Sequence, residues 1–351
     1  MLTRDLPTFA SEARGKRSKE KDEYPHELED SDDENENYVI RATDCLLLAG
    51  KIEEDNASLE VYVYEEKDFN LYTHHDIMLA SFPVALEWLC CDFSSVESTE
   101  VPRANMAIVG MMTPEIEIWN LDLLEPVEPT QVLSGKNAHT DAVTALALHP
   151  IRNNLLASAS ADRSLKIWDF TTMLPVFSCV DYKEAVQGVQ WSQDNESVIF
   201  SYSGDNKLKI FDARSKDSAT NIACGFSIES FTTSPVFTDL IFLGSDDGSI
   251  HIFDIKTGKL QKPAAFANAH KKAIPSLSTN KQGHLISNSL DSVIKVFDIK
   301  TQSLLIQQVT TAESLFGSSI CPDNDSLFAC GSSIGEVVVW DYTFDLKAKS
   351  N

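Results

Sequence analysis

The sequence predicts an all-β fold, a closed propeller of seven four-stranded sheets, and three observations support this. A short pattern of alternating apolar residues, an aromatic residue and usually Asp recurs along the chain, and self-similarity at a fixed spacing is typical of repeat architectures. Helical periodicity is nearly absent from residue 38 onward. The 351 residues are 43% hydrophobic, which is enough for a large core, and no apolar run approaches the ~18–20 residues of a membrane helix.

The aromatic residue of each copy sets the length of the repeat. A degenerate first copy reads LEVYV, and the later copies run from EIEIWN to VVVWD. The aromatic positions are Tyr62, Trp119, Trp168, Phe211, Phe253, Phe297 and Trp340. They are 57, 49, 43, 42, 44 and 43 residues apart, and a blade of four strands takes about 40–45 residues. Seven copies at this spacing predict seven blades.

Each copy also divides into four short strands. In residues 139–180, VTALALH alternates and predicts an inner strand, and LLASAS predicts a second. The tight turn Ala161–Arg163 leads into SLKIWDF, and PVFSCV completes the set. The next copy repeats this order with VQGVQWS, SVIFSYS, KLKIFD and ATNIAC.

Polar residues recur at fixed distances before the aromatic position. Serine stands eight residues before it in five copies, at Ser160, Ser203, Ser245, Ser289 and Ser332. Aspartate stands six residues before it in four, at Asp162, Asp205, Asp247 and Asp291, and two copies open with Ala-His, at His139 and His270. This pattern resembles the Asp-His-Ser-Trp network of WD repeats, so we expect a seven-bladed WD40 β-propeller. The copy ending at Trp168 has all four parts, whereas Phe anchors have no N–H to donate; in the last copy, Trp340 follows Ser332.

The same side chains form nucleophilic triads in enzymes, but recurrence at fixed offsets favours a structural role. Residues 331–335, GSSIG, match the GxSxG motif, yet they fall between two predicted strands rather than at a strand-to-helix turn. His74 and His75 are adjacent in a strand, where side chains point to opposite faces, so we do not expect them to share a metal. The sequence therefore predicts no enzyme, no metal site and no cofactor.

The charge and the cysteine content limit which partners the protein can bind and indicate the redox state of its compartment. The chain has 29 basic and 53 acidic residues, a net charge of −24, and residues 1–37 contribute 12 acidic against 6 basic. Most of the excess thus lies in the folded body, which favours basic proteins such as histones and ribosomal proteins over bare nucleic acid; the alternative is that the charge only keeps the protein soluble. Seven cysteines without a CxxC spacing predict neither disulfides nor zinc, and a reducing compartment.

The first two copies depart from the general WD pattern. Residues 71–88 read LYTHHDIMLASFPVALEW, residues 110–122 read GMMTPEIEIWNLD, and the third copy opens AHTDAVTALALHP. These segments resemble the periodic tryptophan protein 1 family, a eukaryotic WD-repeat family, from about Asp44 to Tyr342. The resemblance implies a nuclear, largely nucleolar protein that works with ribosome assembly factors on the large ribosomal subunit, in precursor-rRNA processing. It also implies links to chromatin and rDNA transcription.

The chain is expected to divide into a disordered charged tail (1–37), the propeller (38–345) and a short C-terminal tail (346–351). The N-terminal tail holds a basic run, with Arg14, Lys16, Arg17 and Lys19, that is a candidate nuclear import signal or simply a solvated segment. Ser31 precedes Asp32-Asp33-Glu34, a context that favours acid-directed kinases, so it is a candidate phosphorylation site.

A propeller must cover the open edge of its last sheet. The last copy supplies three clear strands, and its fourth is expected either from Tyr342–Lys349 or from Tyr38–Ile40. Tyr38–Ile40 is alternatively the inner strand of the first blade. We favour closure by the N-terminal segment.

Three non-enzymatic functions compete at this point. The first is a scaffold for ribosome assembly that binds basic proteins, with pre-rRNA contact indirect. The second is a histone-binding chromatin or rDNA transcription factor. The third is a substrate receptor of a cullin ubiquitin ligase, because Ile210–Arg214 resembles the WD-x-Arg box of such receptors with Phe in the place of Trp.

Overall fold

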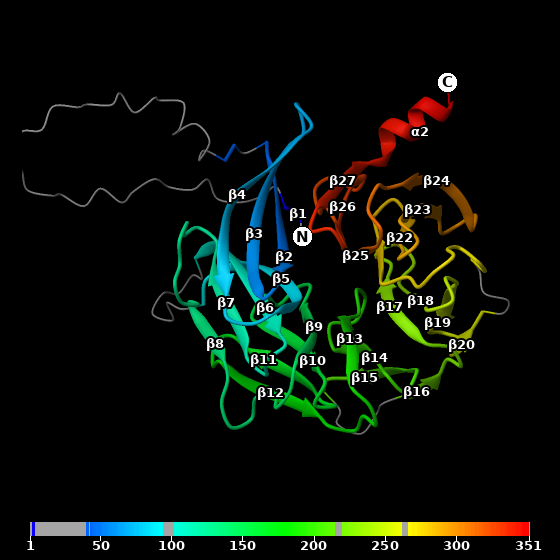
Figure 1. The fold of residues 1–351 in the computed structure, drawn as a ribbon. Coiled ribbons are helices and arrows are strands. Elements are labelled where there is room, and N and C mark those ends of the chain that lie inside the picture. The colour runs from blue at the N-terminus through cyan, green and yellow to red at the C-terminus, as the bar shows by residue number, and fades with distance from the viewer. Residues whose placement is uncertain are drawn as a thin grey trace, which may run out of the picture.

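Seven antiparallel sheets stand around a central cavity in the computed structural model (Figure 1). The structure describes residues 2–3, 40–41, 43–93, 102–214, 220–261 and 266–350. Within these residues six sheets have four strands and the last has three. The predicted seven-bladed, all-β propeller is confirmed, and we number the blades one to seven along the chain.

The strands of blades one to four have the following bounds. Blade one contains β1 (Leu2–Thr3), β2 (Cys45–Glu53), β3 (Asn56–Glu65) and β4 (Asn70–Leu79). Blade two contains β5 (Pro83–Cys91), β6 (Arg103–Met111), β7 (Ile116–Asn120) and β8 (Gln131–Leu133). Blade three contains β9 (Val143–Leu148), β10 (Leu155–Ser160), β11 (Leu165–Asp169) and β12 (Leu174–Cys179). Blade four contains β13 (Val186–Trp191), β14 (Val198–Ser203), β15 (Lys207–Asp212) and β16 (Thr220–Ala223).

The remaining blades continue in the same order, from the inner to the outer strand. Blade five contains β17 (Ile228–Thr233), β18 (Leu240–Ser245), β19 (Ile250–Asp254) and β20 (Lys259–Leu260). Blade six contains β21 (Ser276–Thr279), β22 (His284–Asn288), β23 (Val293–Asp298) and β24 (Ser303–Val309). Blade seven contains β25 (Leu315–Ile320), β26 (Leu327–Ser332) and β27 (Val337–Asp341), and the helix α2 (Tyr342–Ser350) follows.

The hydrophobic core is divided into clusters, each lying between two adjacent blades. Strands alternate their side chains between two faces, and in a radial sheet both faces meet a neighbour. In β10, Ala157 and Ala159 face blade four, whereas Leu156 faces blade two. Seven such clusters join the seven blades into a ring, including one that joins blade seven to blade one.

The repeating aromatic residue is the anchor of each interface. It stands on the third strand and packs in the cluster shared with the preceding blade, so Trp168 packs on blade two and Phe211 on blade three. Trp168 is fully buried and Phe253 is 1% exposed. In the first copy Tyr62 is only half-buried, on the seam with blade seven, which matches the degenerate character of that repeat.

The seam between blades seven and one is closed by side chains. Cys45 and Leu47 of β2 pack with Cys321 and Leu327 of blade seven. The amide of Asn324 donates a hydrogen bond of 3.0 Å to the carboxylate of Glu66. These contacts join the two ends of the ring without a strand shared between its first and last sheets among the described residues.

Among the described residues, neither Tyr342–Lys349 nor Ile40 adds a fourth strand to blade seven. Residues 342–350 form α2 instead, because the carboxylate of Asp341 accepts hydrogen bonds from the backbone N–H and the hydroxyl of Thr343 and so caps a helix. Ile40 packs in the cluster between blades one and two, away from blade seven, and Tyr38 and Val39 lie outside the described residues. The expectation of closure by Tyr342–Lys349 is wrong, and Ile40 does not support N-terminal closure of blade seven.

The inner edge of β2 pairs with Leu2 and Thr3, which thereby form the first strand of blade one. The sequence offers Tyr38–Ile40 as a candidate for this inner strand of the first blade, but Leu2 and Thr3 occupy it. The rest of the predicted tail, residues 4–37, lies outside the described residues, and so do Arg14, Lys16, Arg17, Lys19 and Ser31.

Deleting residues 1–41 removes both β1 and the half-buried Ile40. We expect the melting temperature to fall by about 3 °C, because a loss of about 2 kcal/mol lowers it by about 1.5 °C per kcal/mol when the entropy of unfolding is about 2.1 cal/mol/K per residue. Scanning calorimetry of the full and shortened chains measures this, and the single change Ile40→Ser separates the side chain from the strand. An unchanged melting temperature after the deletion would contradict it.

Candidate functional site

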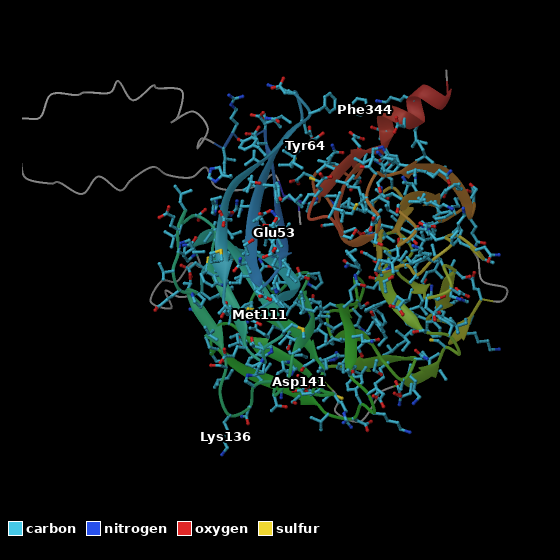
Figure 2. The ribbon with its side chains drawn as sticks, in the orientation of Figure 1. Glu53, Tyr64, Met111, Lys136, Asp141 and Phe344 are labelled. Carbon is cyan, nitrogen blue, oxygen red and sulfur yellow. The ribbon has the colours of Figure 1, made fainter. Side chains whose placement is uncertain are left out.

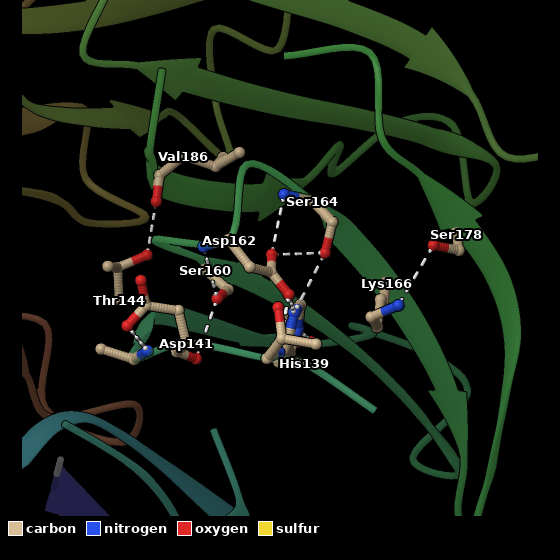
Figure 3. Close-up of polar contacts among 12 residues, drawn as sticks. His139, Asp141, Thr144, Ser160, Asp162, Ser164, Lys166, Ser178 and Val186 are labelled. Carbon is tan, nitrogen blue, oxygen red and sulfur yellow. Dashed lines mark hydrogen bonds and ion pairs between the residues drawn. The ribbon is translucent and has the colours of Figure 1, made fainter. Parts of the chain in front are cut away.

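The most complete polar network lies in blade three (Figure 3). His139 stands before β9, with its Nδ1 atom 3.0 Å from Oδ2 of Asp162 and its Nε2 atom 2.7 Å from Oγ of Ser158. The indole N–H of Trp168 donates to the same Ser158 oxygen at 2.8 Å. Because that oxygen accepts from the indole, its own hydrogen is available to Nε2, and Nδ1–H then donates to Asp162. The hydrogen-bonded series Asp162–His139–Ser158–Trp168 thus connects the anchor on β11 to the turn between β10 and β11.

The serine in this network is Ser158 and not the predicted Ser160. Both side chains lie on the same face of β10. Ser158 lies within hydrogen-bond distance of the indole of Trp168, whereas Ser160 is the last residue of the strand. Ser160 accepts from the backbone N–H of Asp162 and donates to the carbonyl of Asp141. The recurring serine therefore stabilises the turn between the second and third strands, as serines do in such turns.

The other recurring serines have the same local role. Ser203 and Ser245 donate to Asp205 and Asp247, two residues on, and Ser289 accepts from the backbone N–H of Asp291. Ser332 accepts from the backbone N–H of Glu336. The serine eight residues before each anchor does have a repeated structural role. That role is to stabilise the turn between the second and third strands, and not to bond with the anchor.

Asp162 is held in its charged form. Burial raises its pKa, but hydrogen bonds from His139, from the hydroxyl of Ser164 and from the backbone N–H of Thr140 outweigh that effect and lower it below the usual range. His139 itself is 4% exposed and Ser158 is fully buried. These polar atoms are bonded to one another, as buried polar atoms must be.

Blade six has a shorter version of the network. Nδ1 of His270 lies 3.1 Å from Oδ1 of Asp291, and Nε2 lies 2.7 Å from Oγ of Ser287. The network ends at Ser287, since the anchor Phe297 has no polar atom. Burial lowers the pKa of His270.

Blade four uses a tyrosine that sequence reasoning missed. The hydroxyl of Tyr182 lies 2.7 Å from Oγ of Ser201, in the place that imidazole takes in blades three and six. Lys209 lies over the ring of Tyr182, 3.9 Å from its centroid. Tyr182 stands 29 residues before Phe211, as His139 stands 29 before Trp168, so the spacing was the signal that identifies it.

Two tryptophan anchors donate to carboxylates instead of serine. Trp119 donates to Glu117 at 2.9 Å, and Trp340 donates to Asp345 of α2 at 2.9 Å. Trp340 therefore donates to Asp345 and not to Ser332, the recurring serine eight residues before it. The hydrogen bond to Asp345 also holds the first turn of α2 against blade seven.

His74 and His75 lie together, against expectation. A β-bulge in the pairing of β3 with β4 lies between Val61, opposite His75, and Tyr62, opposite Thr73. His74 is the extra residue, so the strict alternation of faces fails there, and the two Nδ1 atoms are 2.8 Å apart. In the part of the chain that the structure describes, no group of three or more His, Cys, Asp or Glu residues is placed to hold a metal ion.

Two further sequence features find ordinary positions. Ser333, the central serine of the GxSxG match, lies in the turn from β26 to β27, with no strand-to-helix elbow at this site. The guanidinium of Arg214 donates to its own neighbour Asp212, 2.6 Å from Nη2 to Oδ2, while its side chain is 70% exposed. No helix in the described ranges is long and apolar enough to cross a membrane.

Fold and networks together define the chain as a WD-repeat β-propeller. The family described as "WD domain, G-beta repeat" matches residues 128–169, which hold the outer strand β8 of blade two and the strands β9 to β11 of blade three. The chain is also a relative of periodic tryptophan protein 1, and the resemblance noted in its first three repeats is confirmed. It is 30% identical to the periodic tryptophan protein 1 homolog of Drosophila melanogaster over 286 residues, 77% of this chain.

Two further relatives extend the comparison. Periodic tryptophan protein 1 of Saccharomyces cerevisiae is 29% identical over 309 residues, 72% of this chain. A protein named "Ribosome biogenesis protein WDR12 homolog" in Trichoplax adhaerens is 22% identical over 291 residues, 74% of this chain. The chain spans 61%, 53% and 62% of the fly, yeast and Trichoplax proteins.

The first prediction for these networks compares the two serines of β10. Ser158→Ala leaves His139 and Trp168 without a buried partner and is expected to cost about 2–3 kcal/mol of unfolding free energy. Ser160→Ala removes only a turn contact and is expected to cost about 1 kcal/mol. Urea unfolding followed by tryptophan fluorescence measures both, and the opposite ranking would contradict the assignment.

The second prediction concerns His75, whose pKa is lowered to about 4 by burial and by the neighbouring His74. The unfolded chain binds a proton near pH ~6.5 and the folded one does not, so stability falls as the pH drops from ~6.5 towards 4. Allowing for partial exposure, we expect His75→Gln to abolish about 1 kcal/mol of the loss between pH 7.5 and 5. Urea unfolding at both pH values tests it, and equal losses in the two proteins would refute it.

Proposed function

We propose that the chain is a non-enzymatic scaffold in ribosome biogenesis, acting in large-subunit assembly and precursor-rRNA processing in the nucleolus. The observation that carries this proposal is the similarity to periodic tryptophan protein 1 over 77% of the chain. The relative named as a ribosome biogenesis protein supports the same direction, with a match over 74% of the chain.

The geometry supports a scaffold rather than a catalyst. His139, Asp162 and Ser158 are bonded to one another inside blade three, where their side chains have little contact with solvent. A nucleophile needs access to substrate as well as a base. The loops between strands are left as the surface on which partners bind.

The charge supports basic proteins as partners. Residues 38–351 hold 41 acidic and 23 basic residues, by subtracting the tail from the totals for the chain. Such a surface attracts ribosomal proteins and repels the phosphates of RNA. We therefore propose that pre-rRNA contact is indirect, through bound proteins.

Residues 4–37, which follow β1 in the chain, are proposed to be a charged segment outside the packed blades. Arg14, Lys16, Arg17 and Lys19 are proposed as its import signal and Ser31 as its phosphorylation site. Mass spectrometry of protein from growing cells, with Ser31 unmodified throughout, would remove the latter.

Sedimentation of cell extract through a sucrose gradient tests the assembly role. The chain is expected in the fractions that hold precursor large subunits, and its depletion is expected to lower mature large-subunit rRNA at least twofold. A chain that stays in the free-protein fractions, with rRNA processing unchanged on depletion, would exclude this function.

Binding of histones is the second candidate, because the acidic surface suits them equally. A pull-down with purified core histones that survives 500 mM salt, about three times physiological strength, would favour it, since screening at that strength removes most surface attraction. For a cullin receptor, Arg214 is paired with Asp212 rather than free, and we do not propose that role.

A further inference from the structure

Exposed apolar side chains gather on one face of the ring, around the seam between blades seven, one and two. This face carries the loops between outer and inner strands and the turns between second and third strands. We call the group the seam patch. Its members are Ile52 (50% exposed), Phe82 (37%), Val84 (45%), Met112 (58%), Phe316 (47%) and Ile334 (53%).

Close backbone approaches make the seam patch continuous. Alternation along β2 turns Gly50 and Ile52 towards blade two, and a Cβ at Gly50 would lie 2.8 Å from Cγ of Pro83. The backbone N–H of Met112 donates to the carbonyl of Phe82 at 3.0 Å, which joins two loops of blade two. Only glycine at position 50 allows the two blades to meet this closely.

The other side of β2 meets blade seven. Lys51 points that way, and a Cβ at Gly335 would lie 3.5 Å from its Cε atom. Gly335 belongs to the turn that carries Ile334. Val84 and Phe316 also line the central cavity, whose volume is about 930 Å³, so the patch borders the mouth of that cavity.

Carboxylates surround the seam patch. The turns that carry it hold Glu53, Glu54, Asp55, Glu115 and Glu336, all exposed. Figure 2 labels Glu53, at the end of β2, and Met111, at the end of β6 beside Met112.

Lys51, near the end of β2, offsets only part of this negative charge. The ammonium of Lys51 lies 2.8 Å from Glu53 and 3.2 Å from Glu60, so it offsets Glu53 but leaves the exposed carboxylates of Glu54, Asp55, Glu115 and Glu336. The rim of the patch is therefore negative.

We propose that the seam patch binds a basic segment of a partner protein, with one or more aliphatic or aromatic side chains set between lysines and arginines. Such a segment places its apolar residue on Met112 and Phe82 and its cations against the acidic rim, so both features are matched by one ligand. RNA is disfavoured because its phosphates meet the same carboxylates. The segments around Phe82 and Met112 are also those that set this chain apart from general WD repeats. The inference rests on the proposed function and names its binding surface.

Synthetic peptides test the chemistry directly. The probe is a fluorescein-labelled peptide with three central leucines flanked on each side by three arginines, and its two controls carry serines for the leucines or glutamates for the arginines. Fluorescence anisotropy with the full chain at 150 mM salt is expected to show at least tenfold tighter binding of the probe than of either control. Equal binding of the probe and the serine control would overturn the proposal.

Substitutions then locate the site. Met112→Ser and Ile334→Ser are each expected to weaken probe binding at least fivefold, and Glu336→Gln at least twofold. Matched controls lie on the opposite face in the loop after β7, where Val127 is 91% exposed and Glu128 is exposed. Val127→Ser and Glu128→Gln are expected to leave binding unchanged. Patch variants that keep their melting temperature and bind like the wild type would overturn the proposal.

The sucrose gradient separates this inference from the proposed function. If peptide binding depends on the seam patch but the wild-type chain never sediments with precursor subunits, only the proposed function fails. If the double variant Met112→Ser/Ile334→Ser sediments as the wild type does, the seam patch is not the docking surface and this inference fails. A photo-crosslinker at position 82 that captures rRNA in those particles rather than a Lys/Arg-rich peptide also overturns it.

Discussion

The fold depends on one contact repeated around the ring, the aromatic side chain of each third strand packed against the preceding blade. Six of these seven anchors are nearly or wholly buried, among them Trp168 and Phe253. Burial of a large ring removes 150–250 Å² from water, and no blade can do this alone because its partner surface belongs to its neighbour. The ring must therefore be closed for all seven anchors to be buried and the fold to be stable.

Polar networks adjust this contact from blade to blade. Trp168 uses a serine and a histidine, Trp119 a glutamate and Trp340 an aspartate from α2. Phe297 uses none, and its histidine stops at Ser287. The shared requirement is that the buried indole N–H of each tryptophan anchor finds an acceptor, and the acceptor comes from the neighbouring strand β10, from the same strand β7 or from the helix α2.

The number of blades and their anchors could be predicted from the sequence because spacing survives substitution. The sequence could not identify which serine bonds to the anchor. Ser158 and Ser160 lie on the same face of β10, two positions apart, and either could be the partner of the indole until the pairing of the strands is known. The meeting of His74 and His75 could not be predicted either, because it depends on a bulge set by pairing with β3. The helix α2 was missed because a single cap at Asp341 decides between helix and strand.

Each interface cluster draws its residues from two adjacent blades only. A change of side-chain packing at one interface is thus met directly only by the two blades that share it. The loops that hold Phe82 and Met112 can therefore differ from the general repeat without altering the packing between distant blades. The loops over one pair of blades thus form a binding surface that can vary separately from the rest of the ring.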